Sequence, residues 1–289
     1  MKIGAARLAI AHRNSKAGTG IPVHPSGGGI RWYFVPLLTG TFAGLFLILP
    51  SAQAQVAAYV TNQGGNSVSV IDTNTNSVVI EVQLADPPGA IAITPDGTRA
   101  YLAKNPDMGP LPAFVSVFDT ATNTVVARVG GSNIPGGVAI TPDGNHAYVT
   151  YGARVNNTLG NFVSVIDRAN NVVATVAVGA APFGVAITPN GPAYVANQLG
   201  NSVSVIDTNT NSVIATVAVG ADPAGVAVTP DGKHAYVTNP IDDTVSVINT
   251  ASNNVVATVT GFSFPWGVAI TPDGTRAYVT NANDIRVGD

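Results

Sequence analysis

The sequence predicts an all-β protein: a β-propeller of four-stranded antiparallel blades, with about five to six blades of which the last is incomplete. Two observations carry this prediction. A unit of 42 to 47 residues repeats along the chain, and each unit holds four short, β-branched segments separated by turn residues. Four antiparallel strands in roughly 40–45 residues match the size of one propeller blade.

The repeat is marked most clearly by a tetrad around Tyr-Val-Thr-Asn. The tetrad occurs six times, at Tyr59–Asn62, Tyr101–Lys104, Tyr148–Tyr151, Tyr194–Asn197, Tyr236–Asn239 and Tyr278–Asn281. A full repeat opens with a segment such as Gly225–Thr229, and a Pro-Asp-Gly turn and the tetrad follow. A segment such as Ser202–Asp207, an Asn/Thr turn and a segment such as Val213–Val219 complete it. The near-continuous apolar character of these strands fits blades that cover one another on both faces.

The turn chemistry supports this order of strands. Thr-Pro-Asp-Gly predicts a tight hairpin, because proline presets φ at the first corner and glycine takes the left-handed conformation that restores pairing. Asp72 and Asp207 end the third strand and begin the Asn/Thr turn. These segments lack the glycine and the final glutamate of a calcium loop. We therefore expect the aspartates to cap their own turns.

A different kind of segment precedes the repeats. All five charged residues of the first 54 are basic, residues 32–50 are apolar and uncharged, and Ser51–Ala54 has small residues before a cleavage point after Ala54. This order predicts a signal peptide over residues 1–54 and a propeller over residues 55–289. The alternative is an uncleaved N-terminal membrane anchor through residues 32–50. Both predict an extracytoplasmic protein, located in the periplasm, at the cell surface or outside the cell.

Composition excludes several classes of function. The 289 residues include no cysteine, which rules out disulfides, zinc–thiolate sites and iron–sulfur clusters. Residues 55–289 carry eight basic and 16 acidic side chains, which argues against nucleic acid as a partner. The two histidines of this part, His146 and His234, recur at the same repeat position, and Glu81 is the single glutamate. We therefore expect no catalytic residue, no metal and no other cofactor.

The repeat motifs resemble a known family. AYVTN, SVSVIDT, NVVATV and PxGVAITPDG recur from about Ala57 to Asn281. In these motifs the chain resembles the YVTN β-propeller repeat proteins. The resemblance implies an extracytoplasmic or cell-surface propeller, often of seven blades and found in surface-layer proteins. It brings no shared catalytic motif.

The blade count leaves the closure of the ring open. Residues 55–289 begin with the second strand of a blade, near Ala57, and end inside another blade, after Tyr278–Asn281. Pairing of Gly267–Thr271 with the first blade would close a five-blade ring. The alternatives are a strained ring of about six blades or a truncated copy of a larger ring. A truncated ring would expose open blade edges, which favour self-association.

Loop lengths point to a candidate binding face. The connection after the tetrad is five and six residues longer in two adjacent repeats, giving the loops 104–113 and 151–161. We expect both loops on the same face of the disc as the Pro-x-Gly loops, and we call this side the loop face. Insertions clustered on one face of a repeat array often mark the binding face. The candidate ligand- or partner-binding residues are Lys104, Asp107, Tyr151, Arg154, Asn156, Asn157, Phe183 and Trp266.

These observations favour an exported, non-enzymatic propeller that acts as a binding or surface-structural scaffold. Its expected partner is a cell-envelope protein or a surface polymer. One alternative is a lactonase- or cycloisomerase-like hydrolase, whose acid, base and cation groups would come from Lys104, Asp107, Arg154, Asp86 and Asp222. The other is an accessory propeller subunit of a periplasmic redox enzyme, by analogy of fold.

Overall fold

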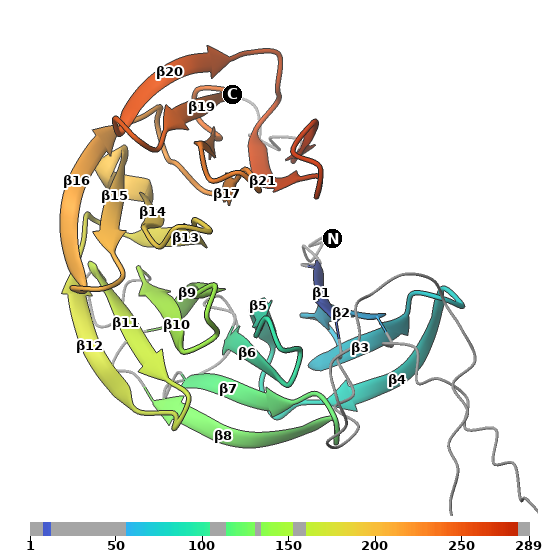
Figure 1. The fold of residues 1–289 in the computed structure, drawn as a ribbon. Coiled ribbons are helices and arrows are strands. Elements are labelled where there is room, and N and C mark those ends of the chain that lie inside the picture. The colour runs from blue at the N-terminus through green and yellow to red at the C-terminus, as the bar shows by residue number, and fades with distance from the viewer. Residues whose placement is uncertain (1–7, 13–55, 105–113, 131–133, 153–159, 283–289) are drawn as a thin grey trace, which may run out of the picture.

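The structure, a computed structural model, describes residues 8–12, 56–104, 114–130, 134–152 and 160–282. These residues form strands and one short 3₁₀ helix. The strands make five four-stranded antiparallel sheets and one two-stranded sheet, each with its strands in the order of the chain. Figure 1 shows the six sheets following one another around a common centre. The predicted all-β propeller is thus confirmed, and the sheets are numbered here as blades 1 to 6.

The blades have similar strand lengths. Blade 1 contains β1 (Leu8–His12), β2 (Val56–Asn62), β3 (Ser67–Asp72) and β4 (Ser77–Gln83). Blade 2 contains β5 (Pro88–Ile93), β6 (Arg99–Lys104), β7 (Phe114–Asp119) and β8 (Thr124–Gly130). Blade 3 contains β9 (Pro135–Ile140), β10 (His146–Tyr151), β11 (Phe162–Asp167) and β12 (Val172–Ala177).

Blade 4 contains β13 (Pro182–Ile187), β14 (Ala193–Asn197), β15 (Ser202–Asp207) and β16 (Ser212–Ala218), with the 3₁₀ helix η1 (Gln198–Gly200) between β14 and β15. Blade 5 contains β17 (Val226–Val228), β18 (His234–Asn239), β19 (Thr244–Asn249) and β20 (Asn254–Val259). Blade 6 contains β21 (Pro265–Ile270) and β22 (Ala277–Asn281).

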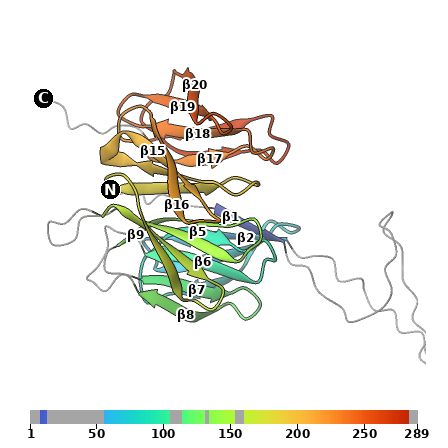
Figure 2. The ribbon, with the colours of Figure 1, turned by 60° about the vertical axis from the view of Figure 1, so that its left-hand side comes forward.

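The hydrophobic core lies between the blades rather than inside any one of them. The first strand of each blade faces the centre, and in blades 1 to 5 the fourth strand forms the rim (Figure 1). The turned view shows the blades stacked flank to flank (Figure 2). Each of the four buried apolar clusters is built from two neighbouring blades, joining blades 1 and 2, 2 and 3, 3 and 4, and 4 and 5. On the rim, valines such as Val173 stay half exposed, at 51%. A blade therefore depends on its neighbours for burial.

The predicted turns are present. Gly97, Gly144, Gly232 and Gly274 all have φ between 68° and 72°, the left-handed conformation expected of them. In blade 3 the Thr141 hydroxyl donates to Asp143 Oδ1 at 2.6 Å, and the backbone N–H of Asn145 donates to the same oxygen at 3.0 Å. These two hydrogen bonds hold the pKa of Asp143 below its usual value. The aspartate is thus part of the turn.

In blades 3 and 4 a tyrosine of the second strand reaches the next blade. Tyr148 Oη donates to Asn211 Oδ1 at 2.5 Å, and Tyr194 Oη donates to Asn253 Oδ1 at 2.7 Å. Both asparagines are left-handed, with φ of 53° and 52°, and lie in the turn between the third and fourth strands. Burial raises the pKa of Tyr148 and of Tyr194 to about 12. We call this contact the tyrosine latch.

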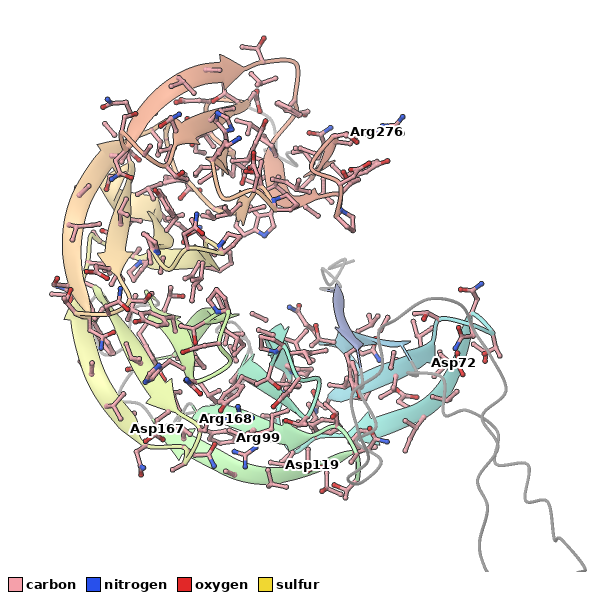
Figure 3. The ribbon with its side chains drawn as sticks, viewed as in Figure 1. Asp72, Arg99, Asp119, Asp167, Arg168 and Arg276 are labelled. Atoms are coloured by element: carbon pink, nitrogen blue, oxygen red, sulfur yellow. The ribbon has the colours of Figure 1, made fainter. Side chains whose placement is uncertain are left out.

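Two more contacts join neighbouring blades. Near the centre, Thr150 Oγ1 donates to the carbonyl of Phe183 at 2.7 Å, and Thr238 Oγ1 donates to that of Trp266 at 2.8 Å. On the turn side, Arg99 donates to the carbonyl of Arg168 at 2.7 Å. Figure 3 shows these two arginines side by side. The threonine contacts join blade 3 to blade 4 and blade 5 to blade 6, and the arginine contact joins blade 2 to blade 3.

The first blade is completed by a strand that the sequence did not predict. β1 pairs with β2 over Leu8–His12 and takes the innermost position of blade 1. The expectation that Gly267–Thr271 fills this position is wrong, because β21 pairs with β22 in a separate sheet. Within the described ranges no strand pair joins blade 6 to blade 1, and Figure 1 shows an open arc.

β1 lies inside the segment predicted as a signal peptide, so cleavage after Ala54 would leave blade 1 with three strands. That cleavage remains a prediction, and residues 32–50 lie outside the described residues. Among the residues that are described, no helix has the length and apolar character needed to cross a membrane.

Blade 6 is open. Its β22 carries Tyr278, which is 61% exposed, whereas Tyr148 and Tyr194 at the same repeat position are 0% exposed. Arg276, at the position of Arg99, stands apart from other labelled charged groups in Figure 3. Blade 6 thus carries the tyrosine and the arginine of the repeat, Tyr278 and Arg276, but no described blade lies beside them.

Candidate functional site

The loop face begins where the second strands end. Lys104 is the last residue of β6 and Tyr151 the last residue of β10. They occupy the position that Asn197 and Asn239 hold in blades 4 and 5. Four predicted site residues lie in the inserted loops outside the described residues: Asp107, Arg154, Asn156 and Asn157.

Lys104 is fixed in an ion pair. Its side chain is 5% exposed, and its Nζ lies 3.2 Å from the carboxylate of Asp86, which is 29% exposed. Asp86 belongs to the connection from β4 to β5, so the pair ties that connection to the end of β6. The structure therefore brings together two groups that the sequence placed on this face. It uses Lys104 inside the protein rather than at the open surface.

Tyr151 also packs inside the protein. It is 1% exposed, and its ring stacks on Phe162 at 4.9 Å between centroids. Burial raises the pKa of Tyr151 to about 12, although a hydrogen bond with Ser164 opposes the shift. Tyr151 is therefore a packing residue of the interior, and its ring is not accessible to a ligand.

Phe183 and Trp266 meet at the inner end of the loop face. Their ring centroids lie 5.5 Å apart in an edge-to-face arrangement, and Phe264 stacks on Trp266 at 6.0 Å. Phe183 belongs to blade 4 and Trp266 to blade 6, while blade 5 places the small, fully buried Ala224 at the corresponding position. We call Phe183, Phe264 and Trp266 the aromatic cluster. All three are half-buried.

The backbone holds the aromatic cluster in place. The carbonyls of Phe183 and Trp266 accept the threonine hydroxyls described above. The N–H of Phe264 donates to Asp243 Oδ1 at 2.7 Å. Phe264 has a φ of 49°, a left-handed conformation that is unusual for an aromatic residue. The sequence reasoning missed Phe264, although its position two residues before Trp266 was a usable signal.

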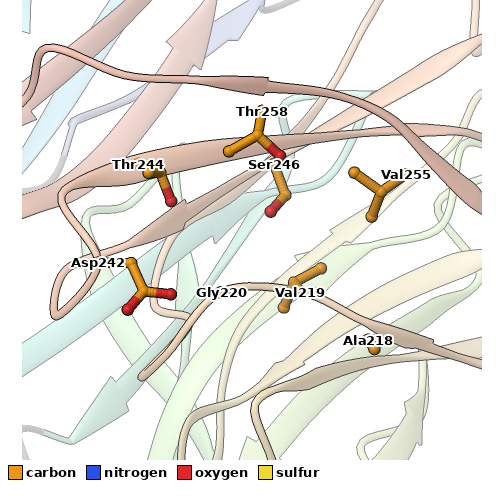
Figure 4. A pocket seen from close by; sticks show the side chains of 8 residues that line it. All are labelled: Ala218, Val219, Gly220, Asp242, Thr244, Ser246, Val255 and Thr258. Carbon is orange, nitrogen blue, oxygen red and sulfur yellow. The ribbon is translucent and has the colours of Figure 1, made fainter.

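A cavity of about 300 Å³ opens between blades 4 and 5 (Figure 4). Its polar side chains are Asp242, Thr244, Ser246 and Thr258, and its apolar walls include Val219 and Val255. Asp242 accepts a hydrogen bond from the N–H of Ala221 at 2.8 Å. This bond holds the carboxylate against the connection from β16 to β17. The volume is at the lower limit of ligand pockets. Sequence reasoning did not find this cavity, because its residues recur as ordinary blade positions.

Of the acid, base and cation groups expected for a hydrolase, Lys104, Asp86 and Asp222 lie among the described residues, and Asp107 and Arg154 do not. Lys104 and Asp86 form the ion pair above, and burial raises the pKa of Asp222. The N–H of Asp222 donates to Asn201 Oδ1 at 3.1 Å, which ties it to the neighbouring blade. No three His, Asp or Glu side chains gather into a metal site within the part of the chain that the structure describes.

Comparisons with known proteins support the fold. The family model of YNCE-like β-propellers matches residues 153–289, a little under half of the chain. A crystal structure of a functionally unknown protein from Desulfotomaculum acetoxidans is similar, with a TM-score of 0.67 and 22% identity over 77% of this chain and 72% of that one. Kuenenia stuttgartiensis hydrazine synthase is similar with a TM-score of 0.54 and 20% identity over 78% of this chain and 89% of that one. A search of curated proteins finds no match.

Proposed function

We propose that this chain is an exported, non-enzymatic propeller that binds a cell-envelope protein or a surface polymer through its loop face. The observation that carries the proposal is the aromatic cluster. Two blades that are not adjacent place Phe183 and Trp266 in contact across Ala224. Half-buried aromatic rings offer a large apolar area with little loss of side-chain entropy on binding, so such a group suits recognition of a partner.

The surroundings of the cluster add to this support. The two insertions that lengthen the loop face, 104–113 and 151–161, come from blades 2 and 3. The cavity between blades 4 and 5 opens along the same series of connections and offers hydroxyl groups and one carboxylate. Apolar rings beside hydroxyls and loops with mixed charges match a partner with both polar and apolar groups, such as a polysaccharide or a protein segment.

A pull-down with envelope extract from the source cells tests the proposal. The full chain is compared with the double variant Arg154→Ala, Trp266→Ala, and we expect the variant to retain less of a partner that the native chain captures. Lys233→Ala is the matched control, because Lys233 is exposed in a Thr-Pro-Asp-Gly turn on the opposite face. If the double variant captures as much partner as the native chain, the loop face is the wrong surface.

Fluorescence gives a second readout on the aromatic cluster. The chain has two tryptophans, Trp32 and Trp266, so Trp32→Phe leaves Trp266 as the single reporter. Titration with a soluble envelope polysaccharide is expected to shift its emission. An unchanged spectrum with a polymer that the pull-down retains would place the contact elsewhere.

The two alternative functions have less support. The hydrolase role requires acid and base groups within hydrogen-bond reach of one substrate atom. Turnover of lactones above the buffer rate, lost in Asp222→Asn, would favour it. The accessory role beside a redox enzyme rests on analogy of fold, because the likeness to hydrazine synthase at 20% identity shows the fold alone.

A further inference from the structure

Four of the turns between the first and second strands share one side-chain hydrogen bond. In blades 2, 3, 5 and 6 the hydroxyl of the turn threonine donates to Oδ1 of the aspartate two residues later, at 2.5 to 2.6 Å. In the turns of blades 3, 5 and 6 this bond is the main cause that holds the pKa of the aspartate below its usual value. The pairs are Thr94 with Asp96, Thr141 with Asp143, Thr229 with Asp231 and Thr271 with Asp273.

The turn of blade 4 lacks this bond. Asn190 stands in place of the aspartate, and one residue, Pro192, separates Gly191 from the Ala-Tyr pair of the second strand, where the other turns have two. Thr188 is 2% exposed, and its Oγ1 has no hydrogen-bond partner among the described residues. A buried hydroxyl without a partner lowers stability, because folding removes it from water and does not replace its hydrogen bonds. Blade 4 therefore holds a buried donor whose usual acceptor, a carboxylate, is missing.

Asn190 is followed by glycine, and this is the single Asn-Gly pair of the sequence. The next backbone nitrogen attacks an asparagine side chain most readily when it belongs to glycine, because no Cβ obstructs the approach. Asn190 is exposed. The N–H of Gly191 donates to the Thr188 carbonyl at 3.1 Å, whereas the corresponding bonds of the other four turns measure 2.7 to 2.8 Å. The nitrogen of Gly191 is thus held less tightly than its counterparts.

We propose that Asn190 is a deamidation site and that its aspartate product completes the turn of blade 4. The backbone nitrogen of Gly191 loses its proton to solvent hydroxide and attacks Cγ of Asn190. The new N–Cγ bond closes a succinimide ring, the Cγ–Nδ2 bond breaks, and the amide leaves as ammonia with a proton from water. Water then attacks Cγ, the N–Cγ bond breaks, and the nitrogen recovers a proton. Overall one water is consumed and one ammonia is released, with no oxidation or reduction.

The aspartate product restores the acceptor that Thr188 lacks. Its carboxylate forms at the position that Asp143 holds in blade 3, two residues after the threonine and directly before the left-handed glycine. The hydroxyl of Thr188 then donates to it, and a hydrogen bond to a charged acceptor is stronger than one to a neutral amide. Attack of water on the backbone carbonyl of the ring instead gives isoaspartate, which lengthens the main chain by one carbon and misplaces the carboxylate. Aspartate is therefore the product that stabilises this turn.

Peptide mapping by mass spectrometry tests the reaction. The full chain is incubated in water enriched in the heavy oxygen isotope at mildly alkaline pH, and conversion is followed at Asn190 and Asn145. Asn145 is the internal control, because it is also exposed in a turn between first and second strands but precedes His146. We expect Asn190 to convert several-fold faster and to give aspartate that carries one heavy oxygen atom. Equal rates at the two sites, a product without heavy oxygen, or isoaspartate alone would overturn the proposal.

Urea unfolding tests whether the product completes the turn. Asn190→Asp reproduces the product, and at neutral pH we expect a higher urea midpoint than that of the freshly prepared native chain. Thr188→Val removes the hydroxyl at nearly constant shape, and in this background Asn190→Asp should leave the midpoint unchanged. The added charge is the same in both backgrounds, so the difference isolates the hydrogen bond.

Circular dichroism confirms that the variants are folded, and the comparison in the native background decides by itself if Thr188→Val does not fold. A midpoint of Asn190→Asp at or below the native value contradicts the proposal. An equal rise in both backgrounds contradicts it as well, because the gain would then come from the charge and not from Thr188.

Discussion

Replacing Tyr194 by phenylalanine tests whether the tyrosine latch stabilises the contact between blades. The ring keeps its packing, because Tyr194 is 0% exposed and phenylalanine has the same shape without the hydroxyl. The change removes the 2.7 Å hydrogen bond to Asn253 Oδ1 and leaves that oxygen, which lies at a partly buried turn, without its donor. Such a loss typically lowers the free energy of unfolding by about 1–2 kcal/mol.

Tyr236 provides the internal comparison. It occupies the same repeat position in blade 5, but its hydroxyl has no partner within the described residues. Tyr236→Phe should therefore change the free energy of unfolding by less than about 0.5 kcal/mol. The difference between the two variants isolates the hydrogen bond from the general effect of removing a hydroxyl.

Urea unfolding followed by circular dichroism measures both variants. We expect a lower midpoint for Tyr194→Phe at an unchanged slope, and a melting temperature lower by about 2–8 °C. The reasoning is refuted if Tyr194→Phe unfolds within error of the native chain. It is also refuted if Tyr236→Phe loses as much stability as Tyr194→Phe does.

Three further predictions concern packing and charge. Gly184→Ala should lower the free energy of unfolding by about 2 kcal/mol or more, because a Cβ there would lie 2.1 Å from the carbonyl oxygen of Ala224. Gly64→Ala is the control and should be close to neutral in the same urea titration, because a Cβ at Gly64 would meet no heavy atom within 4 Å. Asp86→Asn should lower the free energy of unfolding by about 1–3 kcal/mol, because the buried Lys104 ammonium loses its ion pair with the Asp86 carboxylate, whereas removal of the exposed charge in Lys233→Met should change it by less than about 0.5 kcal/mol. The pKa of Asp143 is lower in the folded than in the unfolded chain. Its contribution to the free energy of unfolding is therefore present above pH ~4 and is lost as the pH falls toward the pKa of the folded state. Between about pH 5 and about pH 3 the urea midpoint of Asp143→Asn should decline less than that of the native chain.

Much of the fold follows from short-range chemistry that the sequence displays. The Thr-Pro-Asp-Gly turns set the first hairpin, and the structure gives Gly97 and its counterparts the expected φ. β-branched strands, all but β17 five to seven residues long, then follow in a fixed order. The place of β1 could not be predicted in this way, because pairing between Leu8–His12 and β2 spans a long, dissimilar segment and depends on no local turn.

The candidate site was less predictable. Lys104 and Tyr151 stand first in the inserted loops, which suggests exposure, but the repeat alignment places them where asparagines end the second strand. Alignment with the repeat, rather than loop length, was the better guide to their burial. Contact between Phe183 and Trp266 depends on the small size of Ala224 in the intervening blade, which is a property of three blades together. The cavity beside Ser246 depends likewise on two blades.

An open arc of blades has ends, whereas a closed ring has none. Each buried apolar cluster couples two neighbours, and the four clusters extend from blade 1 to blade 5. In such a one-dimensional array the cost of opening a unit is the sum of its contacts with its neighbours, so terminal units open first. Amide exchange should therefore be fastest in blade 6 and slowest in blades 3 and 4. Unfolding would then begin at the terminal blades and proceed inward. A ligand or strand that covers blade 6 would therefore slow amide exchange in blades several positions away.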